Sequence, residues 1–472
     1  MRDRAWFWSI TQQAGRQGTN YVVFLVLALL LSPEHFGIVS LGASWIAATS
    51  VFAELGFGAA LVQRKDVTPG HLSTTFAINT ALGAALTVAG VGLAGPLARL
   101  FGVPAARTVF QVLSLSFLLN AVSLTQMALA QRDFRFRELA IRDIGASLAG
   151  GVIGIALALL GFGVWSLVAQ TLITALVGAV VLWRISPWRP RLTEISRASA
   201  RELWPYSSRV FGFNLFKYFS QNLDKLLVGY LAGPATLGLY TFAYRIVVYP
   251  VAALSGALGN FFFVSFSRMQ HDLGRVRGMY FRTGRVQAAL LLPALAAIAA
   301  AAPSAVPLVF GDQWSAAIPF VQVFCVVAAA QALMGPVGQL MKSLDRPGWM
   351  LNWSVGFTAL ALAGIAVGSL WGPIGIAVGV AVAYMLGVGI CAPLAARLLH
   401  VGSGSLAAAN APAVLLAGMV GGAVLLVLRL GLDTGGVRLA AAALAGLGAF
   451  WIALPRLDRA AWDNIVQVLR RP

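Results

Sequence analysis

Charged residues are scarce in this 472-residue chain, where Asp, Glu, Lys and Arg together make up only 11%. Hydrophobic residues make up 59%, and the mean hydropathy is +0.82. Soluble globular domains contain about 25% charged residues, so this composition excludes that class. Apolar runs recur between residues 21 and 454, each long enough to cross a hydrocarbon core of about 30 Å as a helix. The sequence therefore predicts a polytopic α-helical membrane protein.

The chain also lacks the groups that typify an enzyme or an ATP-driven pump. Its two cysteines, Cys325 and Cys391, lie in apolar runs, so we expect no structural disulfide. The four histidines show no metal-ligand spacing. The sequence contains no G-x-x-x-x-G-K-[ST] run for binding ATP phosphates. We therefore expect no enzymatic activity, no cofactor and no metal site.

Positive charge exceeds negative charge, with a formal net charge of +18. Cytoplasmic loops of membrane proteins collect Lys and Arg, so we expect no nucleic-acid partner. Turn sequences separate fourteen predicted spans, centred near residues 20, 49, 85, 118, 150, 174, 219, 250, 291, 328, 360, 385, 418 and 446. If the N-terminus is cytoplasmic, most Lys and Arg residues outside the spans fall in the inner segments. The basic residues of the outer segments are then only Arg99, Arg107, Arg429 and Arg438. This asymmetry predicts that both termini are cytoplasmic.

The sequence contains a weak internal repeat. A shift of 201 residues aligns "LSPEHFGIVSL" (31–41) with "AGPATLGLYTF" (232–242), so that Pro33 meets Pro234 and Gly37 meets Gly238. Spans 1–6 and 7–12 thus resemble two copies of one six-helix bundle. Because six is even, both copies begin on the inner side and form a parallel repeat. We predict an all-α fold of fourteen transmembrane helices, with two six-helix lobes and two C-terminal helices.

The longest inner loop divides this predicted fold. It carries the sequence "WRPRLTEISRASARE", and the chain ends in the amphipathic "WDNIVQVLRR". The predicted parts are an N-terminal lobe (1–185), a cytoplasmic linker (186–205), a C-terminal lobe (206–400), helices 13 and 14 (401–455) and a cytoplasmic amphipathic tail (456–472).

Several charged side chains lie at membrane depth, where each costs about 2.5–3.5 kcal/mol on insertion scales. The 201-residue shift aligns Arg16 of the first span with Lys217 of the seventh, so each repeat carries a cation at the same place. Lys225 and Arg245 are further cations within the predicted spans, nearer their outer ends. Facing lipid would be too costly, so we expect these groups to line a water-filled cavity. A net cationic cavity suits an anionic group such as pyrophosphate.

Two acidic residues lie at matching depths. Glu54 is level with Arg16, and Asp224 is level with Arg245. Each pair is either a structural ion pair between helices or part of a coupling mechanism, and the sequence leaves both readings open. Three amides on the seventh span add polar atoms to the predicted cavity lining: Asn214, Gln221 and Asn222.

Five stretches together resemble a known family: "LSPEHFGIVSL", "AELGFGAALVQRKDVTPGHLSTTFAIN", "QRDFRFRELAIRD", "GFGVWSLVAQTL" and "NLDKLLVGYLAGPATLGLYTFAYRIVVYPV". They are similar to bacterial polysaccharide transporters of the colanic-acid-exporter type. These form the lipid-linked oligosaccharide flippase branch of the multidrug/oligosaccharidyl-lipid/polysaccharide exporter superfamily. The resemblance implies alternating access and transfer of undecaprenyl-pyrophosphate-linked oligosaccharide repeat units from the cytoplasmic to the periplasmic leaflet. It also implies that cavity cations hold the pyrophosphate, here Arg16, Lys217, Lys225 and Arg245.

The resemblance further implies a role in exopolysaccharide, capsule or O-antigen biosynthesis in the bacterial inner membrane. We expect a monomer whose partners are the lipid-linked oligosaccharide, the membrane, and a polymerase with other glycan-assembly proteins. The driving force is left open between a coupling ion, Na⁺ or H⁺, acting at Glu54 or Asp224, and downhill flux. Two alternatives remain: a drug/cation antiporter of the same fold, which needs unpaired acids, and a membrane glycan polymerase or ligase, which needs a substantial external loop.

Overall fold

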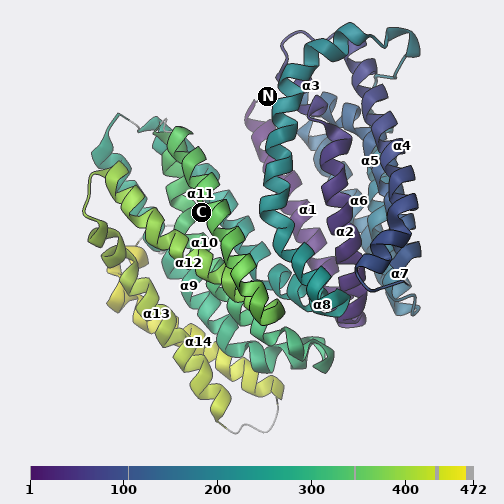
Figure 1. The fold of residues 1–472 in the computed structure, drawn as a ribbon. Coiled ribbons are helices and arrows are strands. Elements are labelled where there is room, and N and C mark those ends of the chain that lie inside the picture. The colour runs from purple at the N-terminus through teal and green to yellow at the C-terminus, as the bar shows by residue number, and fades with distance from the viewer. Residues whose placement is uncertain (1, 105, 270, 345–346, 431–434, 464–472) are drawn as a thin grey trace. The chain divides into compact units, whose positions relative to one another are not determined.

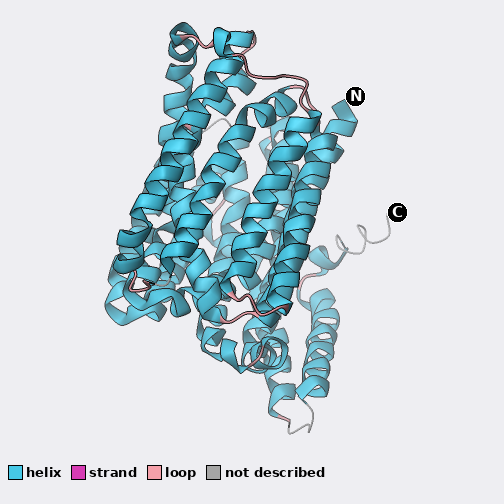
Figure 2. Cartoon of the chain, turned by 90° about the vertical axis from the view of Figure 1, so that its right-hand side faces the viewer, coloured by secondary structure: helices cyan, strands magenta, loops and turns pink. Residues whose placement is uncertain are grey.

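The structure of the protein is a computed structural model that describes residues 2–104, 106–269, 271–344, 347–430 and 435–463. The side chains of some helical residues lie outside this description, Glu54, Lys217 and Gln221 among them. Across the described residues the chain forms helices and short loops with no strand (Figure 2). The predicted all-α class is therefore confirmed.

The chain divides into two compact units, Met1–Gly238 (unit 1) and Leu239–Pro472 (unit 2). The elements of unit 1 are α1 (Arg2–Leu30), α2 (Pro33–Glu54), α3 (Phe57–Gln63), α4 (Pro69–Leu100), α5 (Ala106–Arg132), α6 (Phe136–Leu159), α7 (Val164–Ile185), η1 (Leu192–Glu194) and the first part of α8 (Arg197–Arg268). Figure 1 labels the α-helices.

Unit 2 begins within α8 and continues to the end of the described chain. Its further elements are α9 (Leu273–Phe310), η2 (Asp312–Ala317), α10 (Ile318–Ser343), α11 (Pro347–Gly368), η3 (Ser369–Trp371), α12 (Gly372–Leu399), α13 (Ser403–Arg429) and α14 (Gly435–Leu457).

The long element α8 contains two predicted spans joined by a kink. Its backbone leaves the helical region at Gly233, where φ is 75° and ψ is −179°. A positive φ is readily adopted by glycine, so the "LAGP" sequence can turn the chain without a loop. The predicted turn between the seventh and eighth spans is therefore present at Gly233.

Ten described stretches are long and apolar enough to cross a membrane. Two of them contain two helices each: 222–255 crosses the Gly233 kink, and 352–399 covers α11, η3 and α12. Together with α1 and α2, the described helices supply the fourteen long segments predicted from hydropathy. The chain is a multi-pass membrane protein, and the cytoplasmic placement of its termini stays a prediction.

Small residues let the helices of unit 1 approach closely. A Cβ atom placed on Gly150 of α6 would lie 2.1 Å from the Thr174 hydroxyl oxygen of α7. On the adjacent Gly151 it would lie 2.4 Å from a methyl group of Val23 on α1. Helix α6 therefore packs between α1 and α7 through the glycines of its "GGVIG" sequence.

Aromatic packing fixes one end of unit 2. The Trp314 side chain of η2 is fully buried and stacks on Phe242 of α8, with ring centroids 3.9 Å apart. Phe310, at the end of α9, meets Phe242 edge-on at 5.0 Å. The "FGDQW" turn therefore anchors α9 and η2 to the second part of α8.

The compact units divide at a different place from the predicted lobes. Residues 206–238, assigned by sequence to the C-terminal lobe, pack within unit 1. Helix α8 already begins at Arg197, inside the predicted linker. Whether the six-helix lobes have the predicted bounds stays a prediction. Of the predicted tail, residues 464–472 lie outside the described chain.

Candidate functional site

Two equivalent segments of the predicted repeat cross within unit 1. A Cβ atom on Gly37 of α2 would lie 1.6 Å from the Pro234 carbonyl oxygen of α8. A Cβ atom on Gly238 would lie 1.8 Å from the Pro33 carbonyl oxygen. Each glycine thus packs on the proline of the other copy, which is the reciprocal contact pattern of two-fold symmetry. Only glycine allows two backbones to approach so closely.

This reciprocal crossing supports the register of the repeat. The four residues are the ones that the 201-residue shift aligns: Pro33, Gly37, Pro234 and Gly238. Sequence alignment and spatial contact therefore agree on the same shift. By that shift Arg16 on α1 and Lys217 on α8 occupy equivalent helix positions.

Arg16 lies at the midpoint of α1, which runs from Arg2 to Leu30. Its side chain is exposed, and it forms no hydrogen bond or ion pair with the described residues. A guanidinium cannot give up its charge, so the middle of this helix carries a fixed positive charge. Such a charge at the centre of a span favours a water-filled surface over lipid.

A buried ion pair on α6 contacts α1 at Gln12, which lies one helical turn before Arg16. The side chain of Asp143 on α6 is 4% exposed, and Nη1 of Arg142 lies 2.5 Å from its Oδ1. Gln12 of α1 donates from Nε2 to the second carboxylate oxygen of Asp143 at 2.8 Å. Arg142 Nε also donates to the Gly178 carbonyl of α7 at 3.2 Å. This network, which the sequence did not predict, joins three helices and compensates the buried carboxylate.

The first part of α8 carries most of the predicted polar lining. Asn222 donates to the Tyr218 carbonyl at 3.0 Å, and its own Oδ1 lies 3.4 Å from Lys225 Nζ. The Tyr218 hydroxyl donates to the Ser44 carbonyl of α2 at 2.6 Å, which ties α8 to α2. The side chains of Asn214 and Asp224 are partly exposed on the same helix. Unit 1 therefore brings four of the predicted residues onto one helix: Asn214, Asn222, Asp224 and Lys225.

Four predicted residues remain, and two of them, Lys217 and Gln221, lie on the same part of α8 as this group. Arg245 belongs to unit 2, where its side chain is exposed on the second part of α8. Glu54, Lys217 and Gln221 have side chains outside the described part of the chain. The proposed pairs Glu54–Arg16 and Asp224–Arg245 therefore stay predictions.

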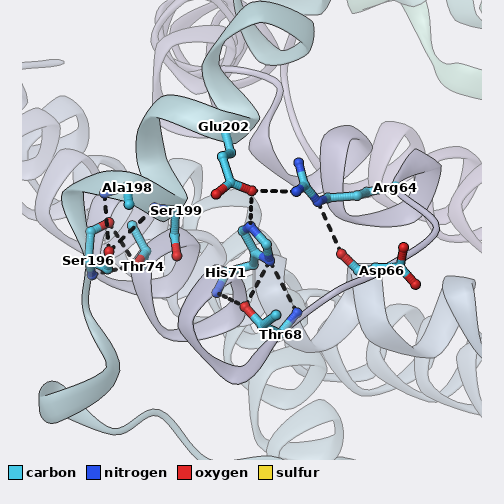
Figure 3. Close-up of polar contacts among 9 residues, drawn as sticks. All are labelled: Arg64, Asp66, Thr68, His71, Thr74, Ser196, Ala198, Ser199 and Glu202. Carbon is cyan, nitrogen blue, oxygen red and sulfur yellow. Dashed lines mark hydrogen bonds and ion pairs between the residues drawn. The ribbon is translucent and has the colours of Figure 1, made fainter.

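A polar network attaches the start of α8 to α3 and α4 (Figure 3). Glu202 accepts hydrogen bonds from the Arg64 guanidinium and from Nε2 of His71, the latter at 3.2 Å. The Thr68 backbone N–H, at the N-cap of α4, donates to Nδ1 of His71 at 3.1 Å. Nδ1 is therefore the acceptor of the imidazole and Nε2 carries its proton. Leu203 packs nearby in a buried cluster with Phe57 and other apolar residues.

The predicted linker follows the same surface. Ser73 of α4 donates to the Glu194 carboxylate at 2.9 Å, and the Ser196 backbone N–H donates to the Thr74 hydroxyl at 2.9 Å (Figure 3 shows the second contact). Residues 194–202 are therefore bound to α4 at several points. This attachment positions the start of α8, which leads into the polar residues 214–225, relative to α3 and α4.

Comparison with known proteins places the chain among proteins of glycan assembly. Residues 26–319 match the model of a family described as polysaccharide biosynthesis protein. The succinoglycan biosynthesis transport protein ExoT of Rhizobium meliloti is 28% identical over 370 residues, covering 77% of this chain and 74% of ExoT. The lipopolysaccharide biosynthesis protein WzxC of Escherichia coli is 26% identical over 369 residues, covering 77% of this chain and 74% of WzxC.

A solved structure shares the fold. The lipid II flippase MurJ in an inward closed conformation superposes with a TM-score of 0.73, covering 96% of this chain and 99% of MurJ. The two sequences are 11% identical, so the likeness concerns the fold alone.

Proposed function

The chain belongs to the family of polysaccharide biosynthesis proteins, and on this premise we propose that it is a flippase for lipid-linked glycans. Its cargo is an undecaprenyl-pyrophosphate-linked oligosaccharide repeat unit. The protein moves this cargo from the cytoplasmic to the periplasmic leaflet of the bacterial inner membrane by alternating access. The names of its relatives, a transport protein and a lipopolysaccharide biosynthesis protein, support the proposal.

The observation that carries the proposal is Arg16. It places a permanent positive charge at the midpoint of a membrane helix, exposed and without a carboxylate partner among the described residues. Leaving such a charge uncompensated is costly, unless an anion joins it during the working cycle. Pyrophosphate meets this need because its oxygens accept charge-assisted hydrogen bonds from guanidinium and ammonium groups.

The repeat extends this argument to α8. Lys217 is the equivalent of Arg16 in the register that the Gly37–Gly238 crossing supports. Lys225 and Arg245 add positive charge further along the same element. The pyrophosphate is therefore bound by cations from both repeats, and the oligosaccharide crosses in the hydrated space beside them.

The antiporter alternative is less well supported. A transporter of cationic drugs needs a carboxylate that is free to bind a cation. The most buried carboxylate on the described membrane helices, Asp143, is already bound to Arg142 and Gln12. That acid therefore stabilises unit 1 and offers no binding group to a cationic drug.

Glycan export tests the proposal directly. Arg16→Ala and Lys217→Ala, alone and together, are expressed in a strain that lacks the native gene, and surface polysaccharide is quantified at matched protein levels. Loss of a charge-assisted hydrogen bond costs about 1.5–3 kcal/mol, so each single variant should bind cargo about 10- to 100-fold more weakly. The double variant should abolish export.

Two controls separate cargo binding from folding and from total charge. Arg16→Lys keeps the positive charge and should retain part of the export. Arg275→Ala removes an arginine whose side chain is 76% exposed at the start of α9, and should export normally. Normal export by the double Arg16/Lys217 variant would contradict the proposed role of these cations.

A further inference from the structure

Helices α11 and α12 are tightly packed over only half of their length. A Cβ atom on Gly368 of α11 would lie 2.2 Å from the Gly375 carbonyl oxygen of α12, and one on Gly379 would lie 2.0 Å from the Gly364 carbonyl oxygen. These four glycines bring the two backbones into contact next to the η3 turn. Farther from the η3 turn, large side chains form the contact between the two helices. There Phe357 meets Tyr384 edge-on, with ring centroids 4.9 Å apart.

A groove of about 750 Å³ opens between the two helices beyond this contact, toward Pro347 and Leu399. Its lining includes apolar and aromatic side chains from both helices, with one arginine: Trp349, Trp353, Phe357, Leu360, Leu394 and Arg397. The rings of Trp353 and Phe357 stack 5.5 Å apart with an interplanar angle of 26°, so they form one flat wall. The groove is therefore a mostly apolar cleft between two helices.

Polar groups of the groove gather at one end. Arg397, in the last turn of α12, has an exposed side chain that forms no hydrogen bond or ion pair with the described residues. Asn352 and the exposed Trp349 lie in the first two turns of α11, at the same end of the antiparallel pair. Tryptophan and arginine in this position are typical of the boundary between acyl chains and lipid head groups. The distribution of basic residues predicts that this end is cytoplasmic.

We propose that this groove binds a polyprenyl phosphate lipid, with the isoprenoid chain between α11 and α12 and the phosphate at Arg397. The inference rests on the proposed function in one respect, since it identifies the lipid as the carrier of the glycan cargo. The groove is then the place where the carrier docks from the cytoplasmic leaflet.

Shape and charge together favour this occupant over a membrane phospholipid. The described residues that line the groove all belong to α11 or α12, and Arg397 is the one cation among them. A carrier lipid has a single isoprenoid chain and an anionic phosphate or pyrophosphate head, which match one apolar groove and one guanidinium. A diacyl phospholipid has a second chain, which would remain outside the groove.

Photoaffinity labelling tests the site. The full chain in phosphatidylcholine nanodiscs is exposed to decaprenyl pyrophosphate that carries a diazirine in its chain, and the labelled peptides are identified by mass spectrometry. Labels should fall on α11 and α12. A Cβ atom on Gly356, a groove residue, would meet no atom within 4 Å, so Gly356→Leu should fill the groove without disturbing the helix. We expect about 10-fold weaker labelling, since the new side chain displaces isoprenoid groups that would otherwise be buried in the groove.

Two further variants distinguish binding of the isoprenoid chain from binding of the phosphate. Arg397→Gln should weaken labelling by the pyrophosphate probe about 10-fold, because one charge-assisted contact is lost, and should leave labelling by a diazirine-bearing decaprenol unchanged. Gly389→Leu, at an equally open glycine of α12 outside the groove lining, should label like the wild-type chain.

The outcomes distinguish the groove from the flippase function. Labels on other helices, or wild-type labelling of both Gly356→Leu and Arg397→Gln, would overturn the groove site even if the chain restores glycan export. Equal competition by phosphatidylglycerol and unlabelled decaprenyl pyrophosphate would overturn the choice of a carrier lipid. If the wild-type chain labels as expected but does not restore export to a deletion strain, the proposed function fails and the lipid site stands.

Discussion

Two charged groups on neighbouring helices of unit 1 have opposite environments. Asp143 is buried and receives hydrogen bonds from Arg142 and Gln12. Arg16, one turn along α1 from Gln12, is exposed and has no hydrogen-bond or ion-pair partner among the described residues. Both lie within membrane helices, where charge is costly. The first charge is compensated inside the protein, whereas the second is the one that the proposed function assigns to the anionic cargo.

This comparison gives a way to assign roles to charges at membrane depth. A compensated pair contributes to the folded state, and breaking it should reduce stability. A charge without a partner contributes nothing favourable to folding, so its removal should affect transport alone. The following variants test this difference, beginning with the largest expected effect on stability.

Asp143→Ala should be the most destabilising change. It leaves the Arg142 guanidinium, whose side chain is 15% exposed, without its counter-charge among the described residues. Breaking a buried pair from one side costs about 3–5 kcal/mol. The free energy of unfolding of the purified protein in detergent, measured by denaturant titration, should fall by this amount.

The matched control replaces both partners. The double variant Arg142→Leu, Asp143→Leu removes both charges together and should recover most of the lost stability, because no unpaired charge stays buried. A double variant as unstable as Asp143→Ala would show that packing at this site, and not charge compensation, maintains unit 1.

Gly37→Ala should have the next largest effect, at the crossing of the two repeats. Its methyl group would overlap the Pro234 carbonyl, which belongs to a backbone and cannot rotate away. Overpacking of this kind costs about 1–3 kcal/mol. Gly18→Ala on α1 is the matched control, since a methyl group there meets nothing within 4 Å and should be neutral or slightly stabilising. Equal stability of the two variants would argue against the close crossing.

Glu202→Gln should have a smaller effect on stability. Glu202 pairs with Arg64 at the surface, and its side chain is 50% exposed. Exposed pairs contribute about 0.2–1 kcal/mol and are screened by salt. The loss should therefore shrink further when the unfolding titration is repeated at high ionic strength, and a loss that persists there would indicate that the His71 contact dominates.

Among the single variants at described positions, Arg16→Ala should change the free energy of unfolding least. The same variant should reduce glycan export most. We expect an unfolding free energy within about 0.5 kcal/mol of the wild type, as for other substitutions away from structural contacts. Export and stability are measured on the same preparation. A loss of several kcal/mol would mean that Arg16 is a structural residue and that the comparison with Asp143 fails.

Much of the fold follows from local properties of the sequence. Long apolar runs predict the helices, and the turn at Gly233 lies where "LAGP" interrupts one of them. Glycines such as Gly150 and Gly151 predict close helix packing because they lack a side chain. The alignment of Gly37 with Gly238 predicts only that the two positions are equivalent, and the structure shows that each packs on the proline of the other copy.

Less of the candidate site could be predicted in this way. Matching depths suggested partners for Arg16 and Arg245, but depth gives no information about which helix faces which. The network at Asp143 was not predicted, because Gln12 is distant in the chain and uncharged, and the pairing of neighbours Arg142 and Asp143 depends on their burial against α1 and α7. The groove at Arg397 also could not be predicted from the sequence, because it depends on how far α11 and α12 separate beyond their glycine contact.

The sequence by itself determined that this protein is a bundle of membrane helices with an internal repeat and an excess of positive charge. Hydropathy and charge are set by the residues within each segment, and each segment enters the membrane according to its own hydropathy. Only the tertiary structure decided which charges are compensated and where two helices leave a groove. Electrostatic compensation and packing act over a few ångströms between side chains far apart in the sequence, so they exist only once the helices have been brought together.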